Sequence, residues 1–167
     1  TDGEVLVDGI NVKDLDLYNL RANIGMAMQD VFLFSDTVEG NIAYSRPDCP
    51  FEEVQKAAIM ADADAFIQAM PDGYDTIVGE RGVGLSGGQK QLLNLASIMV
   101  MQPKLLILDE PTSQLDPIAA SDFLATLKKI NTELGTTILI SEHRLEELLP
   151  MADRVLVMEH GQLAIDD

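Results

Sequence analysis

The sequence predicts an α/β fold in which a parallel sheet is covered by helices and a helical segment is inserted between two parts of the sheet. Strand and helix patterns alternate over residues 104–158, as they do in proteins with a parallel sheet. Leu105–Leu108 is an uninterrupted apolar run, typical of a strand buried on both faces. Residues 45–101 show helical spacing and no convincing strand. We therefore expect a sheet-containing core over residues 1–44 and 102–167, and an α-helical subdomain over residues 45–101.

Short strands and one helical turn are expected at the start of the chain. The dipeptide Asp8-Gly9 favours a tight turn between two strands. The elements are a strand over Glu4–Val7, its return over Ile10–Val12, a helical turn over Asp16–Ala22 and an apolar strand over Ile24–Met28. The last strand delivers Gln29 at its end.

The inserted segment reads as helices separated by turns. Apolar residues recur at helical spacing over Phe51–Met70, with a break expected near Ala61–Asp64. Pro71-Asp72-Gly73 predicts a turn. Ser86 is a suitable N-cap for a helix that runs to about Met101.

The last part of the chain supplies most of the expected sheet. Pro117 and Gly135 mark the start and end of a helical pattern, because proline is favoured in the first turn and glycine after the last. The expected elements are strands over Lys104–Leu108, Thr136–Ile140 and Val155–Met158, and helices over Pro117–Leu134 and Arg144–Leu149.

The charge of the chain excludes some classes of partner. The 28 acidic and 11 basic residues give a net charge of −17 in 167 residues. This charge repels nucleic acid and anionic membrane surfaces, whose binding depends on neutralising phosphate. It does not exclude a small phosphorylated ligand, because local backbone amides and Mg²⁺ can overcome the average charge of the chain. The single cysteine, Cys49, cannot form an internal disulfide and fits a reducing compartment, and no apolar run is long enough to span a membrane.

Two motifs carry chemistry. Asp109-Glu110 follows the buried strand, and the carboxyl ends of strands are where ligands bind in open α/β sheets. Such a carboxylate pair suits a magnesium ion and an attacking water. Twenty residues earlier, Leu85-Ser86-Gly87-Gly88-Gln89 is a glycine-rich turn at a helix start, where free backbone N–H groups suit a phosphate. At this spacing the two motifs resemble the Walker B and signature motifs of an ABC-type ATPase.

The resemblance implies roles for these residues. The aspartate that matches Asp109 helps to hold Mg²⁺ through water, and the glutamate that matches Glu110 polarises the attacking water. The residues that match Ser86, Gly87, Gly88 and Gln89 bind the γ-phosphate of an ATP held by the opposite subunit of a head-to-tail dimer. The cofactors implied are therefore ATP and Mg²⁺.

Three further residues match family motifs. Gln29 lies where the family has its Q-loop, whose glutamine reaches toward Mg²⁺ and the attacking water. His143 matches the switch histidine, which contacts the γ-phosphate. Asp116 matches the D-loop aspartate, which crosses the dimer interface, and it could equally be the N-cap of the helix that starts at Pro117. Both roles of Asp116 can hold at once.

A short segment before the signature resembles the X-loop of ABC exporters. It contains Glu80 and Arg81. The alternative for this pair is a surface ion pair of little energetic value.

One motif of such enzymes does not occur in the sequence, which contains no G-x-x-x-x-G-K-[ST] phosphate-binding loop. In the family, that loop and the strand before it lie upstream of the segment that matches residues 1–9. We therefore expect a P-loop NTPase fold of the ABC ATPase type that lacks its N-terminal strands and phosphate-binding loop. Since phosphoryl transfer depends on that loop, we predict that these 167 residues alone do not hydrolyse ATP.

The resemblance has two parts. Residues 1–90 resemble an exporter-type nucleotide-binding domain, as in the run Gln29–Phe34. Residues 86–167 resemble the energy-coupling ATPases of vitamin or cation importers, as in Asp109–Thr112 and Glu142–Leu145. We expect a hybrid of the two patterns, and the direction of transport stays open.

The function implied is that of the ATPase subunit or domain of an ABC transporter at the cytoplasmic face of a membrane. Its expected partners are a second nucleotide-binding domain and a transmembrane part, docked through the Q-loop and the helical subdomain. The alternative is a non-hydrolytic fragment or binding module that docks to the transporter or to a partner ATPase. A soluble ABC protein of DNA repair or translation fits less well, because the chain is strongly acidic and its Q-loop resembles that of exporters.

Overall fold

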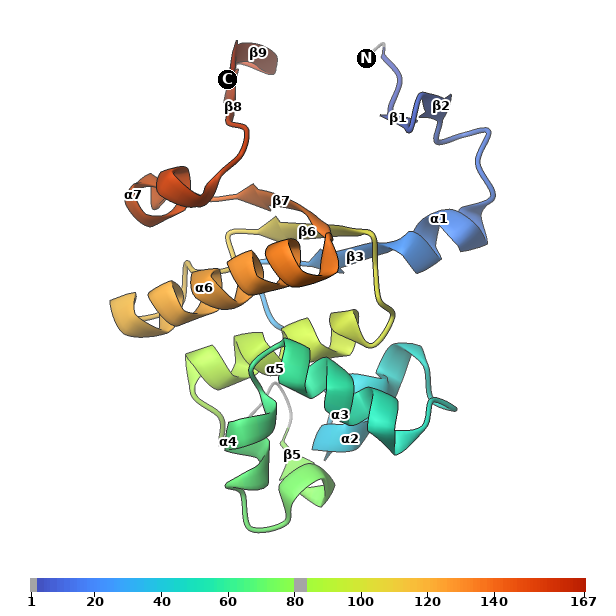
Figure 1. Ribbon diagram of the computed structural model, residues 1–167, viewed down its shortest axis with the longest axis vertical. Helices are drawn as coiled ribbons and strands as arrows, with labels where there is room; N and C mark the ends of the chain where they lie inside the picture. Colours follow the sequence, from blue (N-terminus) through green and yellow to red (C-terminus); the bar gives the residue numbers. More distant parts are fainter. Residues whose placement is uncertain (1–2, 80–83) are drawn as a thin grey trace.

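The centre of the molecule is a three-stranded parallel sheet (Figure 1). The computed structural model describes residues 3–79 and 84–167. The sheet order is β3 (Ile24–Ala27), β6 (Leu105–Asp109) and β7 (Thr137–Ser141). The middle strand, β6, pairs with both neighbours and buries Leu106 and Leu108 at 0% and 1% exposure. The apolar run thus forms the predicted strand, with Leu106 and Leu108 buried, but Leu105 and Ile107 are only half-buried, so one face is less covered than expected.

Helix α6 (Pro117–Leu134) packs against β7 and has the bounds that the sequence predicts. Asp116 caps its start by accepting hydrogen bonds from two backbone N–H groups of the first turn. Gly135 ends it with φ 68°, a left-handed conformation that a glycine adopts at little cost. Its buried face includes Phe123, Leu127 and Ile130.

The helical part of the chain lies on the opposite side of the sheet from the two terminal hairpins (Figure 1). It consists of α2 (Val38–Ile42), α3 (Phe51–Met60), α4 (Asp64–Gln68) and α5 (Gly87–Met99). The break expected near Ala61–Asp64 separates α3 from α4. Helix α5 contacts α2, α3, β3 and α6, so it joins the helical part to the sheet.

The contact between β3 and α5 is close enough to require a glycine. A Cβ atom built on Gly25 would lie 2.2 Å from Cγ2 of Ile98 and 3.2 Å from Cγ of Pro103. These distances are shorter than van der Waals contact, so a larger residue would push the helix from the strand. Gly25 therefore sets how closely α5 approaches the sheet.

A carboxylate with three hydrogen-bond donors lies within the helical part. Asp64 accepts from the Tyr74 hydroxyl at 2.6 Å, from Gln68 at 2.9 Å and from Gln55 at 3.4 Å. Burial opposes ionisation of Asp64, but the three hydrogen bonds outweigh it and hold the pKa of this carboxyl below its usual value. Burial, together with the Asp64 carboxylate, raises the pKa of Tyr74. The hydrogen bond from Tyr74 to Asp64 therefore joins α4 to the turn that follows it, and it is strongest when Asp64 is ionised.

Shorter elements complete the chain, and they match the expectations at its start. The hairpin β1 (Leu6–Val7) and β2 (Ile10–Asn11) precedes α1 (Leu17–Asn23), which Asp16 caps. The remaining elements are α7 (Leu145–Leu148) and the 3-10 turns Ala43–Ser45, Gly73–Asp75 and Leu149–Met151. No helix in the described part of the chain is both long and apolar enough to cross a membrane.

Two strand predictions need correction. The inserted segment was expected to have no strand, but β5 (Ile77–Val78) pairs antiparallel with β4 (Asp36–Thr37). The strand expected at the end of the chain, β8 (Leu156–Glu159), pairs antiparallel with β9 (Gln162–Asp166) rather than joining the described parallel sheet. The tight turn at His160-Gly161, where both residues have positive φ, makes that hairpin locally favourable.

Candidate functional site

Three loops meet at the carboxyl edge of the parallel sheet. Gln29 follows β3, Glu110 follows β6, and His143 follows β7. Because neighbouring parallel strands end at the same edge, residues far apart in the sequence come together there. The strand register fixes this alignment, since Asp109 lies opposite Ser141.

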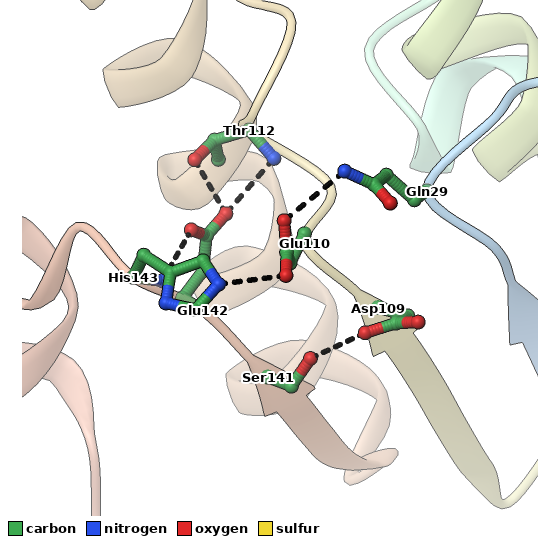
Figure 2. A network of polar contacts seen from close by, with 7 residues as sticks. All are labelled: Gln29, Asp109, Glu110, Thr112, Ser141, Glu142 and His143. Carbon is green, nitrogen blue, oxygen red and sulfur yellow. Dashed lines mark hydrogen bonds and ion pairs between the residues drawn. The ribbon is translucent and has the colours of Figure 1, made fainter.

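Glu110 is at the centre of this edge (Figure 2). Gln29 donates through Nε2 to Oε2 of Glu110 at 3.1 Å, and Nε2 of His143 lies 2.8 Å from Oε1. The Glu110 side chain is 27% exposed and that of His143 is 84% exposed. The carboxylate is thus held by two partners while the imidazole remains open to solvent. We call these three residues the Glu110 cluster.

The backbone of Glu110 is in an unusual conformation. Its φ is 44°, in the left-handed region, where a residue with a Cβ costs about 1–3 kcal/mol. Hydrogen bonds hold it there, because its N–H donates to Ser141 O at 2.9 Å and its carbonyl accepts from Ser113 N–H at 3.1 Å. Strain of this kind gathers at functional sites, where a side chain has to be aimed.

Asp109 has a separate partner. The Ser141 hydroxyl donates to Oδ1 of Asp109 at 2.6 Å (Figure 2). Asp109 and Gln29 offer a carboxylate and an amide oxygen, which are both suitable magnesium ligands. The described residues include no group of three or more His, Cys, Asp or Glu side chains that could hold a metal. Magnesium sites of phosphoryl-transfer enzymes use one or two protein carboxylates, with water and substrate phosphates as the other ligands. The donor set therefore fits a magnesium ion bound together with a nucleotide.

The signature residues start helix α5 with a complete capping box. Ser86 Oγ accepts from Gln89 N–H at 3.2 Å, and Gln89 Oε1 accepts from Ser86 N–H at 3.0 Å. Gly87 and Gly88 follow in the first turn, where no Cβ covers the backbone amides. In the described structure, no hydrogen bond joins these four residues to the Glu110 cluster.

Gly87 packs against the loop that follows β6, and Gly88 packs against the first turn of α6. A Cβ on Gly87 would lie 3.4 Å from Gln114 O, and a Cβ on Gly88 would lie 3.3 Å from Cβ of Ala119. Asp116, between these two neighbours, caps α6 through Oδ1, which accepts from Ile118 and Ala119 N–H groups at 3.0 Å each. The N-cap role expected as one alternative for Asp116 is therefore present.

The same loop is tied to both neighbouring loops. Gln114 donates to Oδ1 of Asp30 at 3.2 Å, which links it to the loop after β3. The Arg144 guanidinium donates to Leu115 O at 3.4 Å, which links it to the loop after β7. The loop after β6 therefore contacts Gly87 of the signature, the Gln29 loop and the His143 loop.

Sequence reasoning did not find the polar residues that support the cluster. Thr112 of the loop after β6 donates to Glu142 of the loop after β7, and Ser141 at the end of β7 donates to Asp109 at the end of β6. The local sequence does not reveal these contacts, because the partners lie about thirty residues apart and meet only through the register of the two strands. Glu80 and Arg81, the expected X-loop pair, lie outside the described residues.

Comparison with known proteins points to one family. The family described as ABC transporter matches residues 1–113. A putative multidrug export ATP-binding/permease protein YgaD of Bacillus subtilis is 44% identical over 163 residues, which cover 98% of this chain and 28% of that protein. A putative multidrug export ATP-binding/permease protein from Staphylococcus aureus (strain NCTC 8325) is 48% identical over 163 residues, which again cover 98% of this chain and 28% of that protein. This chain thus spans little more than a quarter of the length of these relatives.

A solved structure is similar over nearly the whole chain. It is that of a bacterial Atm1-family ABC exporter with ATP bound, with a TM-score of 0.85 and 39% sequence identity. The match covers 99% of this chain and 29% of that one. Both the residues before position 90 and those after it therefore align with export proteins.

Proposed function

The chain belongs to the ABC transporter family, has the fold of its ATPase domains, and on this premise we propose that it binds and hydrolyses ATP as part of an export-type transporter. One observation carries the proposal, namely that Gln29, Glu110 and His143 come from three separate loops and meet within hydrogen-bonding distance. A carboxylate between an amide and an imidazole is an arrangement that can orient and deprotonate a water. Each of the three residues also matches a family motif.

In this proposal, Glu110 polarises the attacking water. Its carboxylate is fixed by Gln29 on one oxygen and by His143 on the other, so its lone pairs have a defined direction. His143 is exposed enough to contact the terminal phosphate of a nucleotide lying at the sheet edge. Electrostatic stabilisation by such preset groups supplies most of the catalysis in phosphoryl transfer.

Asp109 and Gln29 would hold a magnesium ion that is bound with the nucleotide. When bound, the ion neutralises charge that develops on the phosphates. Ser141 donates to one oxygen of Asp109 and so fixes the direction in which the other oxygen faces. A fixed ligand of this kind holds a metal better than a freely rotating one.

The signature residues would act on the ATP of a second nucleotide-binding domain. In the described structure no hydrogen bond joins them to the Glu110 cluster of the same chain, which supports a role across a head-to-tail dimer. Ser86, Gly87, Gly88 and Gln89 form the start of a 13-residue helix, whose positive end favours phosphate. Asp116 would face the partner from the neighbouring loop.

An aromatic cluster supports docking to a membrane part. Phe34 stacks on Tyr44 with ring centroids 4.1 Å apart and meets Phe32 edge-on at 5.0 Å. Phe32 and Tyr44 are 64% and 62% exposed, which is unusual for side chains so large and apolar. Phe32 and Phe34 lie in the same loop as Gln29, so a transmembrane partner seated on the cluster, at the cytoplasmic face of the membrane, would sense the nucleotide site.

The absence of a phosphate-binding motif from these residues limits what they do alone. We propose that the 167 residues supply the Glu110 cluster and the signature, and that another polypeptide segment supplies the loop that holds the phosphates. The test extends the chain at Thr1 with the phosphate-binding loop and preceding strand of an ABC exporter ATPase. The extended chain should hydrolyse ATP with Mg²⁺, and the chain alone should not.

The variant Glu110→Gln decides the role of the carboxylate. In the extended chain it should lower turnover by about 10²- to 10⁴-fold, the size of a general-base contribution. Asp48→Asn is the matched control, because Asp48 is exposed and forms no side-chain hydrogen bond in the described structure. Equal turnover in the Glu110 variant, or turnover by the chain alone that Glu110→Gln abolishes, would contradict the proposal.

A second candidate function rests on the same missing motif. The chain could act as a non-hydrolytic module that offers its signature to an intact partner ATPase. Co-purification with such a partner, with one nucleotide retained and none cleaved at this chain's Glu110 cluster, would favour it. Turnover by the extended chain would favour the first.

A further inference from the structure

One carboxylate joins the loops that carry Glu110 and His143. Oε1 of Glu142 accepts from the backbone N–H of Thr112 at 2.9 Å and from the Thr112 hydroxyl. Oε2 of Glu142 accepts from the backbone N–H of His143 at 3.1 Å. Thr112 is 2% exposed, so its donors depend on this partner (Figure 2).

These contacts bear directly on the Glu110 cluster. Thr112 lies two residues after Glu110, and Glu142 immediately precedes His143. The His143 side chain is 84% exposed, so few neighbours restrain the ring, and its position depends on the backbone that bears it. Hydrogen bonds to a charged acceptor are stronger than those to a neutral one, so the Glu142 carboxylate is a firm anchor for both loops.

We propose that Glu142 is a positioning residue, which holds the His143 ring beside Glu110 by tying the loop after β7 to the loop after β6. Its carboxylate engages Thr112 and the backbone of His143, and it acts on the reaction only through the His143–Glu110 pair. The consequence for ATP hydrolysis rests on the function proposed above. The positioning itself is a property of this chain and can be measured without nucleotide.

The substitution Glu142→Gln separates positioning from general support of the fold. A glutamine has one carbonyl oxygen, which can accept both donors of Thr112, and an amide group that cannot accept from His143. We expect the amide to orient so that the two Thr112 donors stay paired. The variant should therefore keep its thermal unfolding temperature while it releases the backbone of His143.

The measurement is the effect of Glu110→Gln on the NMR signals of the His143 ring. In the otherwise unchanged chain, removing the Glu110 charge 2.8 Å away should shift the ring proton signals clearly. In the Glu142→Gln background the same change should shift them at least about twofold less, because the ring no longer lies beside Glu110. In the background of Glu146→Gln, an exposed glutamate three residues from His143, the full shift should remain.

Two results would overturn the inference. An equal shift in the Glu142→Gln background would show that His143 stays in place without the anchor. No shift in the unchanged chain would show that the His143–Glu110 pair does not exist in solution. If the coupling appears as expected but the extended chain has no ATPase activity, the proposed function fails and the positioning role of Glu142 stands.

Discussion

The helical part α2–α5 and the C-terminal strands β7–β9 use similar apolar residues in opposite ways. In the helical part, Ile42, Val54 and Leu93 are completely buried. In the hairpin β8–β9, every residue is exposed, including Met158 at 64% and Ile165 at 52%. The difference teaches that an apolar pattern predicts an element, whereas the fold decides whether that element is covered.

Substitutions in different parts of the molecule should also affect different properties. In the helical part, large side chains pack on one another, so we expect its substitutions to change the free energy of unfolding. At the carboxyl edge of the sheet, short polar contacts aim individual groups, so we expect its substitutions to change chemistry with little effect on stability. The predictions below test this contrast, from the largest expected effect to the smallest.

The largest difference should come from shortening one leucine in each region. Leu93→Ala in α5 removes a fully buried side chain and should lower the free energy of unfolding by about 2–5 kcal/mol. Leu139→Ala in β7, where the side chain is 51% exposed, should cost about 0.5 kcal/mol or less. Urea unfolding followed by circular dichroism measures both, and similar losses would break the comparison.

A smaller effect is expected where the helical part meets strand β3 of the sheet. Gly25→Ala places a Cβ 2.2 Å from Cγ2 of Ile98, so α5 or the Ile98 side chain has to move, at about 1–3 kcal/mol. The double variant with Ile98→Ala removes the obstructing methyl group. Its loss should therefore be smaller than the sum of the two single losses. Strict additivity would mean that β3 and α5 are not in close contact.

The smallest effects concern two carboxylates whose pKa values are lowered. In the helical part, Asp64 is held by Tyr74, Gln68 and Gln55; in the hairpin, exposed Asp166 is held by Arg154. A lowered pKa in the folded state stabilises the protein above the unfolded value of about 3.9 and loses this contribution as the pH falls through the folded value. Tyr74→Phe should therefore cost about 1 kcal/mol at neutral pH and less below pH 4 or so.

Salt should separate the two carboxylates. At about 1 M salt the screening length is near 3 Å, so the exposed Arg154–Asp166 pair should no longer contribute. The Asp64–Tyr74 hydrogen bond is partly buried and should persist. Unfolding curves of Tyr74→Phe and Asp166→Asn at low and high salt measure the difference. A loss of the Tyr74 effect in salt would contradict it.

Local signals explain what the sequence predicted well. The bounds of α6 follow from Asp116, Pro117 and Gly135, each of which acts on its own turn of backbone. The start of α5 follows from Ser86 for the same reason. Elements that depend on a distant partner were harder to predict. Strand β5 has two residues and exists because β4 pairs with it, and the partner of β8 is set by a turn with His160 at positive φ.

The candidate site divides in the same way. Gln29, Glu110 and His143 could be chosen from the sequence, because each follows a strand and matches a family motif. Their mutual distances, and the support from Thr112, Ser141 and Glu142, could not, because they arise from the pairing of β6 with β3 and with β7. The roles proposed for Gln29, Glu110 and His143, like those of Asp109, Asp116 and the signature residues, stay predictions.

The register of β6 against β7 gives the site an all-or-none character. Asp109 lies opposite Ser141, and each residue of slippage would displace one loop by about 3.3 Å along the strand and turn its side chains to the other face. If β7 were shifted by a single position, the wrong side chains would be buried. The same shift would move His143 away from the edge of the sheet. An extended chain in which β7 pairs one position out of register with β6 should therefore have no turnover, rather than a weakened one.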